Sequence, residues 1–199
     1  MKFPPSSSSR RRLRLLALAA LALAPVLSRA GDIPARLDDF SDPVHSSLGI
    51  NRIIITDTTA GGASTVRQSV ANGVFTAEGE IAPPRGQPGW VSAVLLLSPT
   101  GAPADLTKYT GIKIRVRVRQ GYLSVTANST EIKNYDYHSS MISRKPDEYQ
   151  EVRIAFRDMK RAWSEQTPLN PATIASVNLV AFDLQKGAFA YDVDEIGFY

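Results

Sequence analysis

Five aromatic residues are candidates for ligand contact, because exposed aromatic rings are the usual platform for sugar rings. An aromatic ring packs against the apolar C–H side of a sugar, while polar neighbours hydrogen-bond its hydroxyl groups. Regular alternation would place Tyr135 and Tyr137 on one face, with Asn128 or His138 near them. Ordinary core packing would explain any one of these aromatics equally well. The candidates are Trp90, Tyr122, Tyr135, Tyr137 and Trp163.

Two carboxylates, Asp39 near the start and Asp194 near the end, come together if the first and last strands are neighbours. Calcium prefers clustered hard oxygens, so this pair predicts a structural calcium ion as the one candidate cofactor. Asp38 and Glu195 would contribute through water. The alternative interpretation is that these acids are exposed strand ends or turn formers.

Four basic residues share one face of a single predicted strand: Lys113, Arg115, Arg117 and Arg119. They could bind an acidic glycan or a membrane surface. The favoured interpretation is a solvated face that guards against edge pairing, with acids on adjoining strands offsetting the charges.

Catalytic machinery has little support in the sequence. The chain has no cysteine, no Gly-x-Ser-x-Gly motif and only two histidines, His45 and His138. The acids Asp147 and Glu148 follow Pro146, a setting typical of turns. We therefore predict that the protein is not an enzyme and keep a hydrolase only as a third hypothesis. The missing cysteines also exclude disulfides and zinc-thiolate sites.

The first thirty residues have the composition of an export signal. A basic stretch through Arg14 precedes an uncharged apolar run over 15–27, and Ser28 and Ala30 stand just before Gly31. The run is about half the length of a membrane span, so we predict a signal peptide at 1–30, of Sec or twin-arginine type. The mature chain is then periplasmic or secreted, with no membrane span. The alternative is an organelle-targeting peptide.

The net charge of +4 belongs to this leader. Without its six basic residues, 17 basic residues face 19 acidic ones and the net charge is −2, which argues against nucleic acid as a partner. The six are Lys2, Arg10, Arg11, Arg12, Arg14 and Arg29.

The remaining residues, 31–199, predict a single all-β domain. Turn motifs rich in glycine and proline separate short apolar runs. Residues 112–119 alternate between apolar and basic, and 90–97 is apolar throughout, as a central strand would be. We expect roughly ten strands and one short helical turn near 157–163, which suits a sandwich or jelly roll. The expected strands are 50–56, 64–70, 74–82, 90–97, 112–119, 122–128, 133–142, 149–156, 177–184 and 189–198.

The last strand needs an irregularity. Phe189, Tyr191 and Val193 share one parity, whereas Ile196 and Phe198 share the other. A bulge near Asp194 and Glu195 would restore a common buried face.

Several segments, in order, resemble the complex I intermediate-associated protein 30 family, which has a galactose-binding-like jelly roll related to carbohydrate-binding modules. These segments span nearly all of residues 37–199. They are Asp38-Asp-Phe40, Asp57 with Gly61-Gly-Ala-Ser64, Asn72-Gly73 with Glu78-Gly79-Glu80, Gly89-Trp90-Val-Ser-Ala, Leu106 to Ile112, and Phe189-Ala-Tyr-Asp-Val-Asp-Glu-Ile.

The resemblance implies a galactose-binding-like jelly-roll β-sandwich that binds rather than catalyses. The chain departs from the family pattern at 117–121, where an Arg-Gly-Asp-Gly-Arg turn is usual, and at Tyr149, where a Trp is usual. The first hypothesis is an extracytoplasmic module that binds a protein partner, as an assembly factor does. The alternative is a carbohydrate-binding module that holds a glycan through Trp90, Tyr122, Tyr135 and Tyr137.

Overall fold

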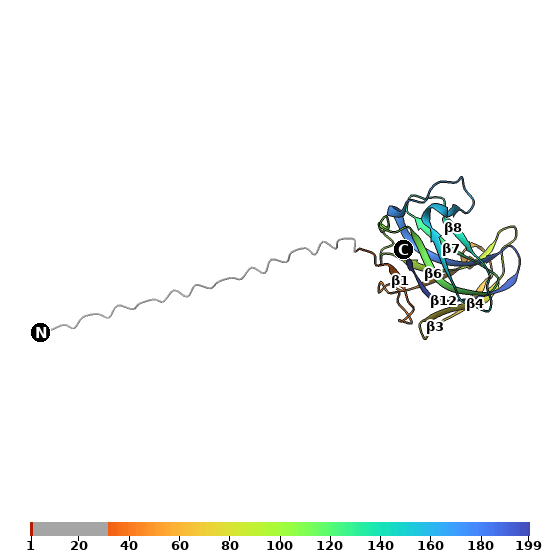
Figure 1. Cartoon of the computed structure of the whole chain (residues 1–199), viewed down its shortest axis with the longest axis horizontal. Coiled ribbons are helices and arrows are strands. Elements are labelled where there is room, and N and C mark those ends of the chain that lie inside the picture. Colours follow the sequence, from red (N-terminus) through yellow and green to blue (C-terminus); the bar gives the residue numbers. More distant parts are fainter. Residues whose placement is uncertain (2–31) are drawn as a thin grey trace.

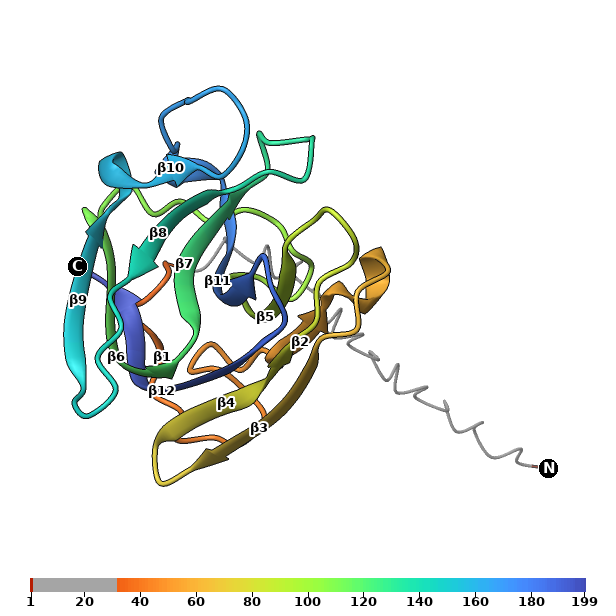
Figure 2. The same cartoon turned by 90° about the vertical axis from the view of Figure 1, so that its right-hand side faces the viewer.

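Two antiparallel sheets of six strands each pack face to face in the computed structural model, which describes Met1 and residues 32–199. The predicted signal peptide lies outside the described residues, apart from Met1. In the first sheet the order is β3-β4-β12-β6-β9, with β1 also paired to β12, and in the second it is β10-β8-β7-β11-β5-β2 (Figures 1 and 2). The fold is therefore an all-β jelly-roll sandwich, as predicted. Among the described residues, no helix has the length and apolar character needed to cross a membrane.

The first sheet consists of β1 (Arg36–Asp38), β3 (Thr65–Ala71), β4 (Val74–Ile81), β6 (Gly111–Gln120), β9 (Gln150–Ala155) and β12 (Gly187–Phe198). The second sheet consists of β2 (Ile53–Thr56), β5 (Gly89–Leu96), β7 (Tyr122–Ser129), β8 (His138–Ile142), β10 (Lys160–Arg161) and β11 (Ile174–Asp183). Three 3-10 turns are interspersed, namely η1 (Asp57–Ala60), η2 (Phe156–Asp158) and η3 (Pro171–Thr173).

The core lies between the sheets and is built by period-two alternation. In β6 the apolar members, including Ile114 and Val116, are buried, while the basic members are half-buried or exposed on the other side. In β5 residues 91–95 are all buried, and the strand lies inside the sheet between β11 and β2. Both predictions for these strands are confirmed.

The predicted bulge in β12 is also confirmed. Val193 pairs with Val116 and Glu195 with Arg115, so Asp194 is an extra residue against the regular ladder of β6. The bulge keeps Val193 and Ile196 on the buried face.

The first and last strands of the sandwich lie side by side. Arg36 pairs with Gly197 and Asp38 with Ile196, so β1 continues the first sheet beside the C-terminal half of β12 (Figure 1). The N-terminal half of β12 pairs with β4 instead.

One predicted strand is largely wrong. Residues 133–137 do not extend β8, which begins at His138, because Tyr135 adopts a left-handed backbone conformation with a φ of 62°. Tyr135 and Tyr137 therefore do not share a strand face. The single helical turn expected at 157–163 is also wrong, since η2 ends at Asp158 and β10 follows at Lys160–Arg161.

Candidate functional site

The second sheet has an outer face of unusual composition. Leu123, Val177 and Ala93 belong to the core, and alternation turns their strand neighbours to the opposite side. We call this side the outer face. Its members on β8, β7, β11, β5 and β2 are Ser139, Met141, Tyr122, Ser124, Thr126, Asn128, Ser176, Asn178, Val180, Phe182, Trp90, Ser92, Val94, Leu96, Ile53 and Ile55.

Three aromatic side chains form a row across the outer face. Tyr122 on β7 pairs with Phe182 on β11, and Phe182 pairs with Trp90 on β5. The ring centroids of Tyr122 and Phe182 lie 6.2 Å apart. Tyr122 is 57% exposed, whereas Trp90 and Phe182 are half-buried. The row therefore presents aromatic surface to a ligand at one end of the face.

Small polar residues occupy the middle of the outer face. Ser124, Thr126, Ser92 and Asn178 are all buried, although they point away from the core. Asn178 donates from Nδ2 to Asn128 Oδ1 at 3.3 Å. The Ser92 hydroxyl and Asn178 Oδ1 have no hydrogen-bond partner in the structure. Buried polar atoms are normally satisfied, so these two are exceptions, and both are closed off from solvent in this structure.

Within the part of the chain that the structure describes, the outer face carries no charge on those five strands. On the sixth strand, β10, the exposed Lys160 pairs with Ser139 and lies on the same face. Its two sides are apolar and exposed. Ile53 and Ile55 on the edge strand β2 are each 41% exposed, and Met141 on β8 is 53% exposed.

The outward side of the first sheet is the opposite case, a surface of paired charges. Each basic residue of β6 meets an acid of the neighbouring β12: Lys113 with Glu195, Arg115 with Asp194, and both Arg117 and Arg119 with Asp192. Arg119 also reaches Glu78 on β4, one strand further away. The prediction of offset charges is confirmed. The predicted role of these basic residues as a guard against edge pairing is wrong, because β6 lies inside the sheet between β12 and β9.

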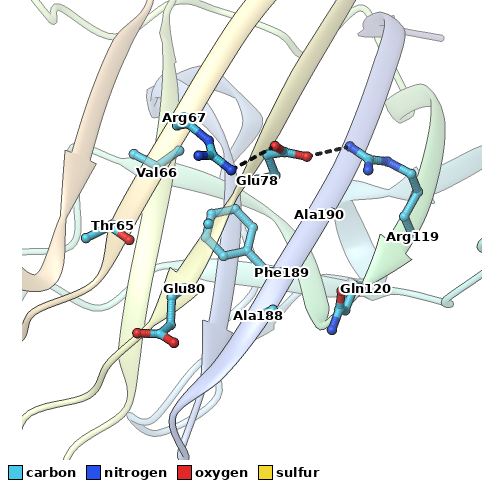
Figure 3. A pocket seen from close by; sticks show the side chains of 11 residues that line it. Thr65, Val66, Arg67, Glu78, Glu80, Arg119, Gln120, Ala188, Phe189 and Ala190 are labelled. Carbon is cyan, nitrogen blue, oxygen red and sulfur yellow. Dashed lines mark hydrogen bonds and ion pairs between the residues drawn. The ribbon is translucent and has the colours of Figure 1, made fainter.

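A hollow of about 450 Å³ lies on this charged side, where Gly79, Ala188 and Ala190 leave room. Glu78 bridges Arg67 and Arg119 across it (Figure 3). The acid is thus already neutralised by its neighbours, and none of the predicted site residues lines the hollow.

The other predicted aromatics lie in two loops that a buried carboxylate joins. Asp136 accepts hydrogen bonds from the backbone N–H groups of Tyr137, Ala162 and Ser164, and its side chain pairs with Arg161 at 2.8 Å. Burial would raise the pKa of Asp136, but these hydrogen bonds outweigh it and hold the pKa below its ordinary value.

The two loops display aromatic rings of differing exposure. Tyr135 is 93% exposed and Trp163 is 60% exposed. Tyr137 is half-buried and packs edge-on against Trp163 at 5.3 Å between centroids. The predicted ligand residues therefore divide into two groups, Trp90 and Tyr122 on the outer face and Tyr135 and Tyr137 in the loops.

The predicted calcium ligands both have arginine partners. Asp39 accepts hydrogen bonds from Ser41, which lower its pKa, and pairs with Arg36 at 3.2 Å. Burial raises the pKa of Asp194, against the opposing effect of Arg115.

No group of three metal-ligating side chains occurs within residues 32–199. Calcium binding by Asp39 and Asp194 stays a prediction, and a melting temperature measured with calcium and with chelator tests it.

The two histidines have structural contacts. His138 is buried, and its Nε2 lies 2.7 Å from the Thr167 carbonyl oxygen. His45 is exposed beside Asp42, whose pKa is lowered to about 2 by hydrogen bonds from the backbone N–H groups of His45 and Val44. Neither histidine contacts a serine or threonine hydroxyl in the described structure.

The sequence did not predict three residues of the candidate site, namely Ser92, Asn178 and Phe182. Alternation within 177–184 contained a usable clue, since Asn178 and Phe182 share a parity opposite to the apolar Val177 and Leu179. Nothing local could indicate that β11 lies between β5 and β7.

Comparisons with solved structures agree with this fold. The family 11 carbohydrate-binding module of cellulase Lic26A-Cel5E from Clostridium thermocellum is 15% identical, with a TM-score of 0.57 over 81% of this chain and 92% of that one. A family 30 carbohydrate-binding module is 14% identical, with a TM-score of 0.52 over 83% and 98%. The agarase AgWH50C is 10% identical, with a TM-score of 0.55 over 81% of this chain but only 24% of that one.

A search of curated proteins by sequence finds no match. The model of the complex I intermediate-associated protein 30 family matches residues 40–193. This range includes β2 to β11, the first part of β12 and the whole aromatic row. The chain therefore belongs to the complex I intermediate-associated protein 30 family.

Proposed function

We propose that the protein is a non-catalytic binding module that holds a neutral saccharide chain against the outer face of the second sheet. The observation that carries this proposal is the aromatic row of Tyr122, Phe182 and Trp90 on the outer face.

The chemistry of the outer face fits a sugar ring. Exposed aromatic rings offer flat apolar surface to the C–H side of a pyranose. The small polar residues Ser92 and Asn178 lie one or two rungs from the aromatic row, since Ser92 pairs with Val180 and Asn178 pairs with Val94.

On the described strands that carry the aromatic row, β5, β7 and β11, the outer face has no charged side chain, which favours a ligand that is neutral there. The described face has a cation, Lys160, at its β10 edge, paired with Ser139. Along the row, a sulfated or uronic acid polymer would leave its anions without cationic partners. The basic residues that could attract such a polymer lie on the first sheet and are already paired with acids. The two matched modules are named as carbohydrate-binding, which supports a saccharide as the ligand class.

Affinity electrophoresis and calorimetry against neutral soluble polysaccharides test the proposal. We expect wild type to bind at least one neutral glucan, xylan or galactan. Tyr122→Ala should weaken binding about tenfold, because a lost aromatic contact costs about 1.4 kcal/mol.

Tyr149→Ala is the matched control, since Tyr149 lies on the first sheet under Arg115 and Arg117. Its affinity should equal that of wild type. The proposal fails if wild type binds no neutral polysaccharide, or if both tyrosine variants lose affinity equally.

A protein partner is the second candidate, favoured by the exposed Ile53, Ile55 and Met141 on both sides of the outer face. The family description, which names association with a complex I intermediate, supports the same idea. Capture of a reproducible partner from a membrane extract by wild type, but not by an Ile53→Ser and Ile55→Ser double variant, would favour it over the saccharide.

We further propose that the protein acts outside the cytoplasm, in the periplasm or as a secreted protein, because of the leader composition. N-terminal sequencing of the purified native protein should begin at Gly31. A cytoplasmic protein that retains Met1 would contradict export, and organelle fractionation tests the alternative of an organelle-targeting peptide.

A further inference from the structure

We infer that Asp57 is a positioning residue for Trp90, and that the Asp57, Gly62, Ser64 and Gly89 cluster sets the aromatic end of the outer face. The inference rests on the proposed function for its binding consequence. Its structural consequence, the fixed position of Trp90, can be measured without any ligand.

The Asp57 carboxylate is fully buried and joins three elements. It begins η1, directly after β2. Its Oδ1 accepts from the backbone N–H of Ser64 at 3.0 Å, and its Oδ2 accepts from the Ser64 hydroxyl at 2.6 Å. Oδ2 also accepts from the backbone N–H of Trp90 at 3.1 Å. The carboxylate thus holds the start of β5 against the segment that leads into β3.

Two glycines make room for this carboxylate. A Cβ on Gly62 would lie 2.2 Å from Asp57 Cγ. A Cβ on Gly89 would lie 2.9 Å from Asp57 Oδ2 and 2.7 Å from Ile81 Cγ2. A larger residue at either position must displace its surroundings, so the position of the carboxylate is closely defined.

Ser64 extends the cluster to the end of β4. Its hydroxyl accepts from the backbone N–H of Ala82 at 2.9 Å while it donates to Asp57. The residues between Ala82 and Gly89 form the connection into β5, so the same cluster fixes both ends of that connection.

Asp57 differs in this respect from the other buried carboxylates. Asp38, Asp136 and Asp192 each pair with an arginine. The recorded donors to Asp57 are instead two backbone N–H groups and one hydroxyl. One of those donors belongs to Trp90, whose ring lies in the aromatic row beside Phe182. The hydrogen bonds of this buried carboxylate therefore fix the backbone at Trp90, which carries one ring of the aromatic row.

Tryptophan fluorescence provides a test that needs no ligand. The chain has two tryptophans, so a Trp163→Phe background leaves Trp90 as the sole reporter. In that background, Asp57→Asn places an amide donor against N–H donors and should shift the Trp90 emission to the red. Ser64→Ala is the milder variant, and it should give a smaller shift in the same direction if Asp57→Asn fails to fold.

Asp192→Asn is the matched control, because Asp192 is a buried carboxylate on the outward side of the first sheet. Its Trp90 emission should equal that of the background protein. For a polysaccharide that wild type binds, Asp57→Asn should weaken affinity about tenfold and Asp192→Asn should leave it within about twofold.

The possible outcomes distinguish the positioning role of Asp57 from the proposed saccharide binding. Folded Asp57→Asn protein with unchanged Trp90 emission overturns the positioning role, as does an equal red shift in Asp192→Asn. A red shift in Asp57→Asn without any polysaccharide binding by wild type supports the positioning role and overturns the proposed function. If Asp57→Asn does not fold, an unshifted Ser64→Ala variant overturns the positioning role.

Discussion

Single buried carboxylates hold the loops and strand ends of this protein in place. Asp38 binds Arg52 through two hydrogen bonds, of 2.6 and 2.9 Å, and also accepts from the backbone N–H of Phe40. Asp136 likewise binds Arg161 and accepts from the backbone N–H of Tyr137, so it joins the loops around these two residues. Each carboxylate satisfies backbone groups that no strand partner reaches, so each is worth more than an exposed ion pair.

Asp136 gives a prediction with a defined pH dependence. Its pKa in the folded protein is lowered, so its contribution to stability is present above the unfolded value of 3.8 and is lost as pH falls through the folded pKa. Asp136→Asn should lower the free energy of unfolding at pH 7 by about 3 kcal/mol, because Arg161 is left buried without its partner. Urea denaturation should show a smaller difference between variant and wild type at pH 3.

The control for this pH effect is Glu148→Gln, which removes an exposed ion pair with Lys145. That variant should change stability by less than about 1 kcal/mol at either pH. An equal loss for Asp136→Asn at pH 7 and pH 3 would contradict the role of the ionised carboxylate.

Strands are the scale at which the sequence is most informative. Alternation in β6 and the change of parity in β12 predicted the buried faces and the bulge, because both depend only on neighbours along the chain. Residues 133–137 were wrongly placed in a strand. Their conformation depends on Asp136 binding Arg161, twenty-five residues away, and no local pattern contains that contact.

The candidate site was predictable only in part for the same reason. Trp90 and Tyr122 are recognisable as strand aromatics, but Phe182 joins them only because β11 lies between β7 and β5. The unpartnered oxygens of Ser92 and Asn178 likewise become visible only after burial is known.

The bulge in β12 gives a prediction at the level of the element. Deleting Asp194 removes the extra residue and leaves Val193 and Ile196 on the buried face of a regular strand. Deleting Ala190 instead reverses the face of Phe189, which is buried in the core. The second deletion should cost at least about 2 kcal/mol more than the first in urea denaturation, from the exposed Phe189 ring. Equal losses would mean that Asp194 is required for the register itself.

The molecule as a whole separates two chemistries on its two outward surfaces. The first sheet pairs its basic residues with acids, while the described outer face of the second sheet is uncharged on β5, β7 and β11 and combines an aromatic row with small polar groups. One core cluster, with members from Ile33 to Phe198, lies between them. Under the proposed function, the ligand contacts β7, β11 and β5.

Nuclear magnetic resonance mapping tests that assignment most directly. Adding a neutral polysaccharide that the protein binds to ¹⁵N-labelled protein should shift the amide signals of β7, β11 and β5. The indole N–H signal of Trp90 should shift with them. Signals of β6 and β12 around Arg117 and Asp192 should stay in place. Shifts confined to the first sheet or to the loops around Tyr135, with the indole of Trp90 unmoved, would contradict the account.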